Sequence, residues 1–321
     1  MTAPLVSVLV TAYDAEPWLT ETLASATGQT YENVEVVVVD DGSTDGTLAV
    51  ARRFEGPRVK VVAQDNAGAC AARNRALAEA QGDLVQYLDA DDLLAPDKIE
   101  RQVARLRDEP EGTVASGPWV RFREVPGDMG PGGEPGWADY EPAVRWLVQS
   151  WAPGGGMMPP FAWLTPRPLV DAAGPWDESL LKNQDGEFFA RVLAQARKVA
   201  FCPEAWGYYR SGLAMSVSAQ RGARVARSLY AAAESSVRAV LGRLDTDEAR
   251  RACAALWHGV AFETFPVAPD VGRRAEAQAL ALGGSDARPG GGRAFRLVRD
   301  VAGWKAAVRL QHAWYRVRYG R

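Results

Sequence analysis

Short apolar runs alternate with helical patterns through the first hundred residues. The runs are residues 5–10, 34–39, 58–63 and 84–88. Residues 5–10 and 34–39 have the β-branched composition of a strand that is buried on both faces of a sheet, and the other two runs have the length of a strand. Between them, apolar residues recur at helical spacing in residues 18–27, 48–51 and 69–80. Strands that alternate with helices predict an α/β fold, with a doubly wound, mostly parallel sheet flanked by helices.

The pattern changes after about residue 110. Two stretches rich in glycine and proline, residues 126–136 and 153–156, predict loops. Strand-like pieces at residues 114–122, 162–165 and 199–202 accompany a helical piece at 187–196. From about residue 220 the pattern is helical. We therefore divide the chain into residues 1–110, residues 111–218 and a helical C-terminal extension, residues 219–321.

Composition and net charge argue against several classes of protein. The net charge of -3 gives no indication of a nucleic-acid partner. Three distant cysteines form no disulfide framework or CxxC pair, and two histidines exclude a His-rich zinc site. We find neither the pattern of a signal peptide at the N-terminus nor an apolar run long enough to span a bilayer, and we expect a cytoplasmic protein.

Acidic side chains follow the ends of the predicted strands. The three strand ends are Thr11-Ala12-Tyr13-Asp14, Asp40-Asp41-Gly42-Ser43 and Asp89-Ala90-Asp91-Asp92. In an open parallel sheet these ends meet at the edge where ligands bind. Helix N-capping accounts for Ser43 and Asp45. It does not account for two acidic clusters on adjacent strands, where like charges repel unless a cation or ligand relieves them.

The spacing of Asp89 and Asp91 suits a hard cation. Mg²⁺ and Mn²⁺ prefer oxygen ligands, and Mg²⁺ is commonly held by one or two carboxylates together with substrate phosphates. No glycine-rich phosphate loop follows the first strand. We therefore expect phosphates to be held through a divalent cation rather than by a backbone cradle.

Several motifs in order resemble those of the family-2 inverting glycosyltransferases of the GT-A fold. The resemblance covers about residues 4 to 218. It runs through Val6-Ser7-Val8-Leu9-Val10-Thr11, Gln29-Thr30-Tyr31, Asp40-Asp41-Gly42-Ser43, Ala72-Arg73-Asn74, Leu88-Asp89-Ala90-Asp91-Asp92, Pro96-Asp97-Lys98, Gly174-Pro175-Trp176-Asp177-Glu178-Ser179 and Gln184-Asp185-Gly186-Glu187-Phe188. It implies a GT-A-like sheet, with the nucleotide-sugar donor bound by residues 1–110 and the acceptor and catalytic base in residues 111–218.

The resemblance also implies roles for single residues. Thr11, Tyr13 and Asp41 would surround the nucleotide base and ribose, and the backbone near Arg73 and Asn74 would close that pocket. Asp89 would face the ribose or the metal, and Asp91 would ligate Mn²⁺ or Mg²⁺. For Asp92 two alternatives stay open: a metal ligand, or a cap for the segment that follows.

Asp185 would be the general base. An inverting transfer is a single displacement at the anomeric carbon, and the acceptor hydroxyl must lose a proton as it attacks. One carboxylate on the acceptor side meets that need. Judged without the family, Asp185 could equally be the N-cap of the helix after it. Glu187 is the second candidate for the base.

Two positions depart from the family pattern. Gln184 stands where the family has Glu before the base, and Gly212 stands where a His is expected after Tyr209-Arg210. For Arg210 itself, contact with the donor diphosphate and a structural salt bridge are both open. The tryptophans of the middle region are expected in the core; they are Trp119, Trp137, Trp146, Trp151 and Trp163.

The tail, residues 293–321, is basic and partly amphipathic. It holds eight Lys or Arg residues against one acid, Asp300. Such a helix either lies on an anionic membrane, which would place the protein at the inner membrane face, or packs on its own catalytic domain with a solvated basic face. Both alternatives stay open.

These patterns together predict an enzyme. We expect a metal-dependent inverting glycosyltransferase that uses a nucleotide-sugar donor, with UDP favoured by the resemblance, and a hydroxyl acceptor that is a saccharide or is lipid-linked, in polysaccharide or glycoconjugate biosynthesis of the cell envelope. One alternative is a nucleotide-sugar-binding protein without catalysis. Another is a sugar nucleotidyltransferase, which resembles this chain less because Ala12-Tyr13-Asp14-Ala15-Glu16 replaces its glycine-rich loop.

Overall fold

The computed structural model describes residues 3–129, 136–152, 158–213 and 221–319. Most of the two glycine-rich loops predicted above therefore lies outside the described residues. The chain forms two compact units. The first comprises Met1–Val144, Met158–Glu178 and Phe188–Ser216, and the second comprises Arg145–Met157, Ser179–Glu187 and Val217–Arg321.

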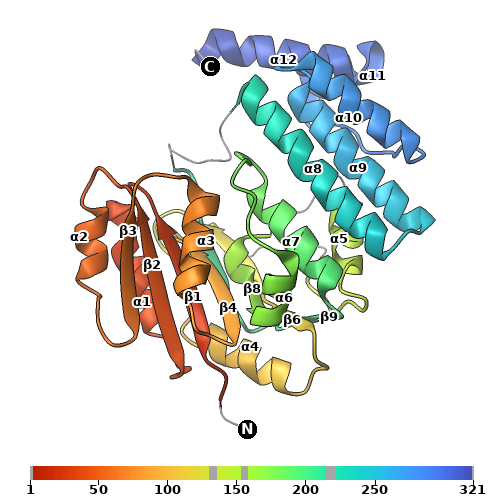
Figure 1. The fold of residues 1–321 in the computed structure, drawn as a ribbon. Coiled ribbons are helices and arrows are strands. Elements are labelled where there is room, and N and C mark those ends of the chain that lie inside the picture. Colours follow the sequence, from red (N-terminus) through yellow and green to blue (C-terminus); the bar gives the residue numbers. More distant parts are fainter. Residues whose placement is uncertain (1–2, 130–135, 153–157, 214–220, 320–321) are drawn as a thin grey trace. The chain divides into compact units, whose positions relative to one another are not determined.

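A seven-stranded sheet forms the centre of the first unit (Figure 1). Its strands are β1 (Val6–Ala12), β2 (Val34–Asp41), β3 (Val59–Gln64), β4 (Leu84–Asp89), β6 (Thr113–Ser116), β8 (Trp163–Pro166) and β9 (Lys198–Phe201). They lie in the order β3-β2-β1-β4-β8-β6-β9. β1 to β4 are parallel to one another, and only β8 runs antiparallel to its neighbours. The predicted doubly wound, mostly parallel sheet is confirmed.

Helices cover both faces of the parallel strands. α1 (Glu16–Thr27) and α2 (Thr47–Arg52) lie behind the sheet in Figure 1, and α3 (Ala69–Glu79) lies in front of β1 and β2. This arrangement follows from right-handed crossovers, because the chain moves outward from β1 to β3 and then back to β4. α4 (Lys98–Arg107) and α6 (Arg167–Ala173) complete the layers.

A second, three-stranded sheet is built from β5 (Leu93–Leu94), β10 (Gly207–Arg210) and β7 (Trp119–Phe122). The prediction of one strand across residues 114–122 was wrong, because β6 and β7 belong to different sheets. The chain turns at Gly117-Pro118. A Cβ at Gly117 would lie 2.2 Å from the carbonyl oxygen of Ala205, so only glycine allows this close approach.

The second unit is helical, and it includes residues 145–157 and 179–187 besides the C-terminal part of the chain. Its helices are α5 (Arg145–Trp151), α8 (Ala223–Arg243), α9 (Asp247–Thr264), α10 (Pro269–Ala281), α11 (Arg293–Ala302) and α12 (Trp304–Tyr319). α9 packs against α5, α8 and α10. α7 (Gln184–Gln195) begins in the second unit and ends in the first. No helix of the described residues is long and apolar enough to cross a membrane.

The tryptophans lie where the core was expected. Trp119, Trp146, Trp151 and Trp163 are buried. Trp137 is half-buried, with its ring stacked on Phe201.

Candidate functional site

Strand register brings the polar strand ends together. Thr11 on β1 lies opposite Val39 on β2 and opposite Asp89 on β4. The next residue, Ala12, pairs with Asp40. The ends of β1, β2 and β4 therefore form one rim, as their parallel arrangement predicted.

Asp41 organises the loop that leads into α3. Its carboxylate accepts hydrogen bonds from Ala67 N at 2.9 Å and Gly68 N at 2.8 Å, and from the side chain of Gln64 at 2.7 Å. Gly42, with φ of +72°, brings this strand end close to the same loop, and a Cβ there would lie 2.7 Å from Asn66 N. The buried Asp41 thus shapes the backbone of the rim.

The connections after β1 and β2 are tied to each other. Asp14 Oδ1 accepts from Thr44 N at 2.7 Å, and Ser43 Oγ accepts from Asp14 N at 3.1 Å. The expectation that Ser43 caps α2 was wrong, because the N-cap position is Gly46 and Ser43 is used in this cross-connection. Asp45 does satisfy the start of α2 by accepting from Thr47 N. Tyr13, half exposed between these segments, leaves a ring face open to solvent.

Asp89 is held by a chain of contacts that begins at Trp176. The guanidinium of the buried Arg73 lies 4.4 Å from the ring centroid of Trp176 and donates to Asp89 Oδ1 at 2.7 Å. Asn74, the next residue of α3, accepts a hydrogen bond from Trp176 N at 2.8 Å and donates one to the carbonyl oxygen of Trp176 at 3.0 Å. The side chains of Arg73 and Asn74 therefore join the turn around Trp176 to the acidic strand end.

Asp91 and Asp92 differ in surroundings. Burial, and after it the charge of Asp89, raises the pKa of Asp91 to about 6. Asp92 is 1% exposed, and its Oδ1 accepts from Arg210 N at 2.8 Å. Burial, and then the charges of Asp91 and Asp89, raises the pKa of Asp92 well above its usual range. Asp92 caps no helix, since α4 begins after Asp97.

Arg210, the last residue of β10, also stabilises the acidic turn. Its Nε donates to the backbone oxygen of Asp91 at 2.9 Å, and its Nη2 pairs with Glu21 at 2.7 Å. The guanidinium also lies 4.4 Å from the ring centroid of Phe122. Of the two alternatives for Arg210, the structural salt bridge is therefore present.

The carboxylates of the acidic turn fit a hard divalent cation such as Mg²⁺. Within the described residues, no three His, Cys, Asp or Glu side chains form a ready-made metal cluster. Asp89 and Asp91 are oxygen donors. Burial raises the pKa of Asp91 and the charge of Asp89 raises it further, and a cation would relieve this repulsion. One or two carboxylates with substrate phosphates are the usual surroundings of Mg²⁺.

Asp185 lies in the first turn of α7, in the second unit. Glu187, two residues on, is 2% exposed and accepts from Ser235 Oγ on α8 at 2.6 Å. This bond ties α7 to α8, so Glu187 is engaged in packing of the second unit. The role of Asp185 as base stays a prediction.

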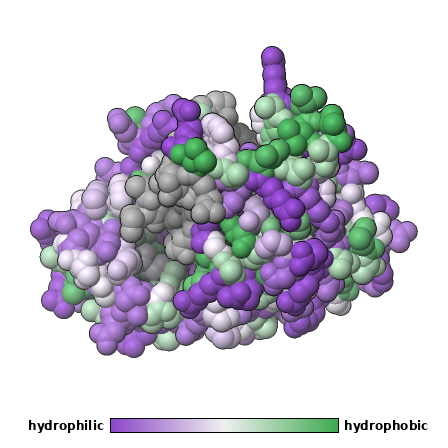
Figure 2. All heavy atoms as spheres, turned by 90° about the horizontal axis from the view of Figure 1, so that it is seen from above, coloured by the Kyte–Doolittle hydropathy of each residue, from purple (hydrophilic) through white to green (hydrophobic). Residues whose placement is uncertain are grey.

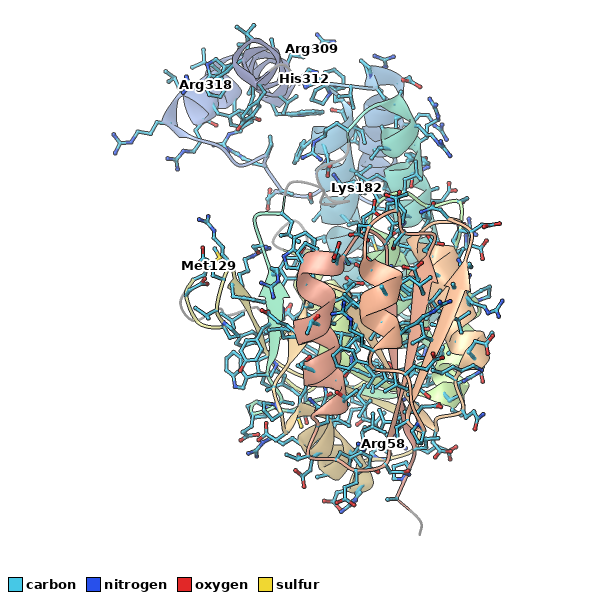
Figure 3. The ribbon with its side chains drawn as sticks, turned by 90° about the vertical axis from the view of Figure 1, so that its left-hand side faces the viewer. Arg58, Met129, Lys182, Arg309, His312 and Arg318 are labelled. Atoms are coloured by element: carbon cyan, nitrogen blue, oxygen red, sulfur yellow. The ribbon has the colours of Figure 1, made fainter. Side chains whose placement is uncertain are left out.

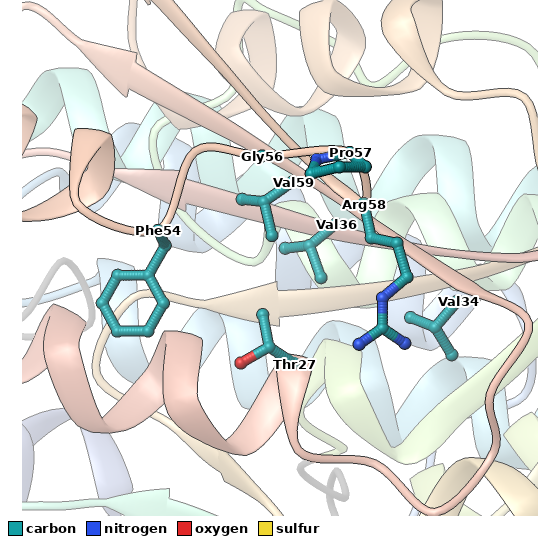
Figure 4. A pocket seen from close by; sticks show the side chains of 8 residues that line it. All are labelled: Thr27, Val34, Val36, Phe54, Gly56, Pro57, Arg58 and Val59. Atoms are coloured by element: carbon teal, nitrogen blue, oxygen red, sulfur yellow. The ribbon is translucent and has the colours of Figure 1, made fainter.

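A cavity lies at the opposite edge of the sheet from the acidic rim. Figure 4 shows its lining: Thr27, Val34, Val36, Phe54, Gly56, Pro57, Arg58 and Val59. Val34 is the first residue of β2, whereas Asp41 is its last. The lining has one charged side chain and no carboxylate, so we assign this cavity no part in the chemistry of the rim.

Comparison with known proteins identifies part of the chain. Residues 7–148 match the family described as "Glycosyl transferase family 2". An uncharacterized glycosyltransferase of Haemophilus influenzae is 40% identical over 106 residues, which are 32% of this chain and 42% of that protein. The chain thus spans about two-fifths of the length of this curated relative.

Solved structures share the fold of the whole chain. The crystal structure of S. aureus TarS 1-349 in complex with UDP-GlcNAc has a TM-score of 0.70 and 18% identity, covering 99% of this chain and 93% of that one. The mannosyltransferase PcManGT from Pyrobaculum calidifontis, in complex with GDP-Man and Mn²⁺, has a TM-score of 0.54 and 21% identity, covering 98% and 88%. At these identities the likeness shows the fold, which is GT-A-like.

Sequence reasoning missed residues that support the family-2 motifs. Glu21 on α1 pairs with Arg210, and no local pattern indicates it. Lys98 is fully buried, and its Nζ donates to the side-chain oxygens of Gln86 and Gln102 at 2.8 and 2.7 Å. The motif Pro96-Asp97-Lys98 contains Lys98, but its partners became visible only in three dimensions.

Proposed function

We propose that this protein is a glycosyltransferase that moves a sugar from a nucleoside-diphosphate sugar to a hydroxyl acceptor with inversion. The observation that carries the proposal is the acidic turn after β4, where Asp89 lies opposite Thr11 at the end of β1. The match of residues 7–148 to glycosyl transferase family 2 supports it.

The donor would lie along the rim. The exposed ring of Tyr13 would stack on the nucleotide base, with Thr11 and the loop shaped by Asp41 beside it. Asp89 has one oxygen paired with Arg73, so its other oxygen is suited to accept from a ribose hydroxyl or to bind the cation. We propose UDP as the nucleotide.

Asp91, with Asp89, would hold Mn²⁺ or Mg²⁺ against the diphosphate. When bound, such an ion stabilises the charge that develops on the departing diphosphate. The chain's own part is to hold Asp91 in place through Asp92 and Arg210. The donor set, and Mn²⁺ in the structure of PcManGT, support this assignment.

In the transfer itself, a bond forms between the acceptor oxygen and the anomeric carbon as the bond from that carbon to the diphosphate oxygen breaks. Asp185 would take the proton of the acceptor hydroxyl. The acceptor we propose is a saccharide or lipid-linked hydroxyl compound of a cell-envelope glycoconjugate, used on the cytoplasmic side of the membrane.

Calorimetry tests the donor site. UDP, GDP and dTDP are titrated with and without Mn²⁺ into wild type, Asp91→Ala and the control Glu55→Ala, an exposed carboxylate between α2 and β3, at the edge of the sheet opposite the acidic rim. We expect Mn²⁺-dependent binding of UDP, lost in Asp91→Ala and kept in the control. If no nucleoside diphosphate binds in the presence of Mn²⁺, the proposal is wrong.

Turnover tests the base. With UDP-sugar and a simple acceptor alcohol or water, Asp185→Asn should lower kcat by roughly 10² to 10⁴ and leave UDP affinity unchanged. Glu187→Gln, which keeps an acceptor for Ser235, serves as the control and should retain kcat. An equal loss of kcat in both variants would contradict the assignment of Asp185 as the general base. Donor binding without turnover in wild type would favour the alternative of a binding protein.

A further inference from the structure

The tail formed by α11 and α12 exposes an apolar stripe that its own unit leaves uncovered. Trp304 packs against Phe262 and Phe265 of α9, and Ala307 and Val308 are buried. These residues anchor one face of α12. On another face Leu310, Trp314 and Val317 are exposed, and Val317 is 89% accessible to solvent.

The stripe is continuous along the helix. Leu310, Trp314 and Val317 follow the spacing i, i+4 and i+7, which places them on one side of α12. At 3.6 residues per turn, Arg309 lies about 100° to one side of Leu310 and Arg318 about 80° to the other. Figure 3 labels both arginines on this helix. The guanidinium of Arg318 lies 5.4 Å from the ring centroid of Trp314.

α11 also exposes apolar side chains to solvent. None of its residues is buried, and Leu297 and Val301, one turn apart, are 67% and 81% exposed. Exposed apolar side chains on a soluble domain usually mark a contact surface when they gather beside one another. Figure 2 shows one face of the molecule, on which apolar side chains gather in places among polar ones.

The charges around the stripe indicate its occupant. Arg299 pairs with Asp300, and Lys305 pairs with Glu276 on α10. The charge of Arg296 also acts on Asp300. Among the described residues Arg293 and Arg309 form no salt bridge with a carboxylate, and the guanidinium of Arg309 lies 4.8 Å from the ring centroid of Phe265. A second copy of this chain would bring the same cations against them. An anionic surface would instead neutralise them while the apolar stripe enters its outer layer.

We propose that α11 and α12 bind the surface of an anionic lipid bilayer, with Leu310, Trp314 and Val317 inserted at the level of the headgroups and the arginines at their phosphates. Trp and Arg suit this boundary, since each has an apolar body and a polar end. The surface belongs to the second unit and the acidic rim to the first, and the inference does not depend on the proposed transfer.

Sedimentation with vesicles tests it on the full chain. Vesicles of phosphatidylcholine alone are compared with vesicles that also contain phosphatidylglycerol. We expect binding only to the second kind, weakened by salt. The variant Leu310→Ser/Trp314→Ser/Val317→Ser should lower the partition coefficient by more than about tenfold. Arg309→Gln should lower it roughly fivefold on anionic vesicles.

Leu280→Ser removes an equally exposed apolar side chain from α10 and should bind as wild type does. Thermal unfolding checks that the triple variant is folded, and UDP titration on the same samples reports the donor site separately. Absence of wild-type binding, or equal binding by the triple variant, would overturn the inference. The inference would also be overturned if light scattering showed that wild type is a dimer and the triple variant a monomer, because a second copy of the chain would then cover the stripe.

Discussion

Asp92 is a buried carboxylate that connects the acidic turn to β10. Its Oδ1 accepts from the backbone of Arg210, whose side chain in turn holds the backbone oxygen of Asp91. Both bonds fix the turn on which Asp91 stands. We therefore expect the repeated aspartates of the motif to have different tasks: Asp89 and Asp91 would contact the ligand, and Asp92 would support the turn through its bond to β10.

Substitution of Asp92 separates these tasks. Asp92→Asn keeps an oxygen for Arg210 N, so Mn²⁺-dependent UDP binding should stay within about threefold of wild type. Asp92→Ala leaves a buried N–H without its partner, which should lower the free energy of unfolding by about 1–3 kcal/mol and weaken binding as the turn loosens. Calorimetry and urea unfolding measure both. If Asp92→Asn loses metal-dependent binding as fully as Asp91→Asn does, Asp92 is itself a ligand.

At the scale of elements, Lys98 joins α4 to β4 beneath the acidic turn. Its Nζ donates to Gln86, which lies on β4 three residues before Asp89, and to Gln102 on α4. The two glutamine side chains donate onward to the carbonyl oxygens of Phe161 and Ala162, before β8. Burial lowers the pKa of Lys98 to about 7, and the neighbouring Cys202 opposes this shift.

This shift predicts how stability depends on pH. Between about pH 7 and pH 10.5 the unfolded chain keeps the proton of Lys98 that the folded chain has released. The unfolded state then binds more protons, so Lys98 makes the free energy of unfolding rise with pH in this window, by at most about 1.4 kcal/mol per unit.

Lys98→Met should remove that contribution, and urea unfolding at pH 7 and pH 9 measures the difference in slope from wild type. Lys60→Met is the control, because Lys60 is half exposed and paired with Glu79. Equal slopes for wild type and Lys98→Met would mean that Lys98 stays charged in the folded protein.

At the scale of the whole molecule, the C-terminal helices depend on segments from earlier in the chain. α9 packs on α5, whose Trp146 and Trp151 are buried, and Ser228 and Ser235 on α8 bind Leu181 and Glu187. All of these residues belong to the second unit. The unit is therefore discontinuous in sequence.

A fragment of residues 219–321 should not fold as a cooperative unit, because the faces of α8 and α9 that meet α5 and the start of α7 would be exposed. We expect helical far-UV circular dichroism, binding of a hydrophobic dye and a broad thermal transition. Residues 1–292, which lack only the tail, should unfold in a sharp transition. A sharp transition in the isolated fragment would show that the extension folds alone.

The sequence by itself determined the parallel sheet, its flanking helices and the acidic rim. Those features depend on local periodicity, and parallel strands that follow one another place their ends at one edge. It also indicated Asp89, Asp91 and Asp185 through the order of the motifs, and the roles of these residues remain predictions.

Only the tertiary structure decided which side chains hold the rim together. Asn74 with Trp176, Arg210 with Asp92 and Glu21 with Arg210 are all far apart in sequence. Periodicity carries no information about such pairs, because each depends on how whole elements pack. The same reason explains why one strand was wrongly predicted across Gly117-Pro118. An apolar run passes there from one sheet to another, and only the packing shows where the first strand ends.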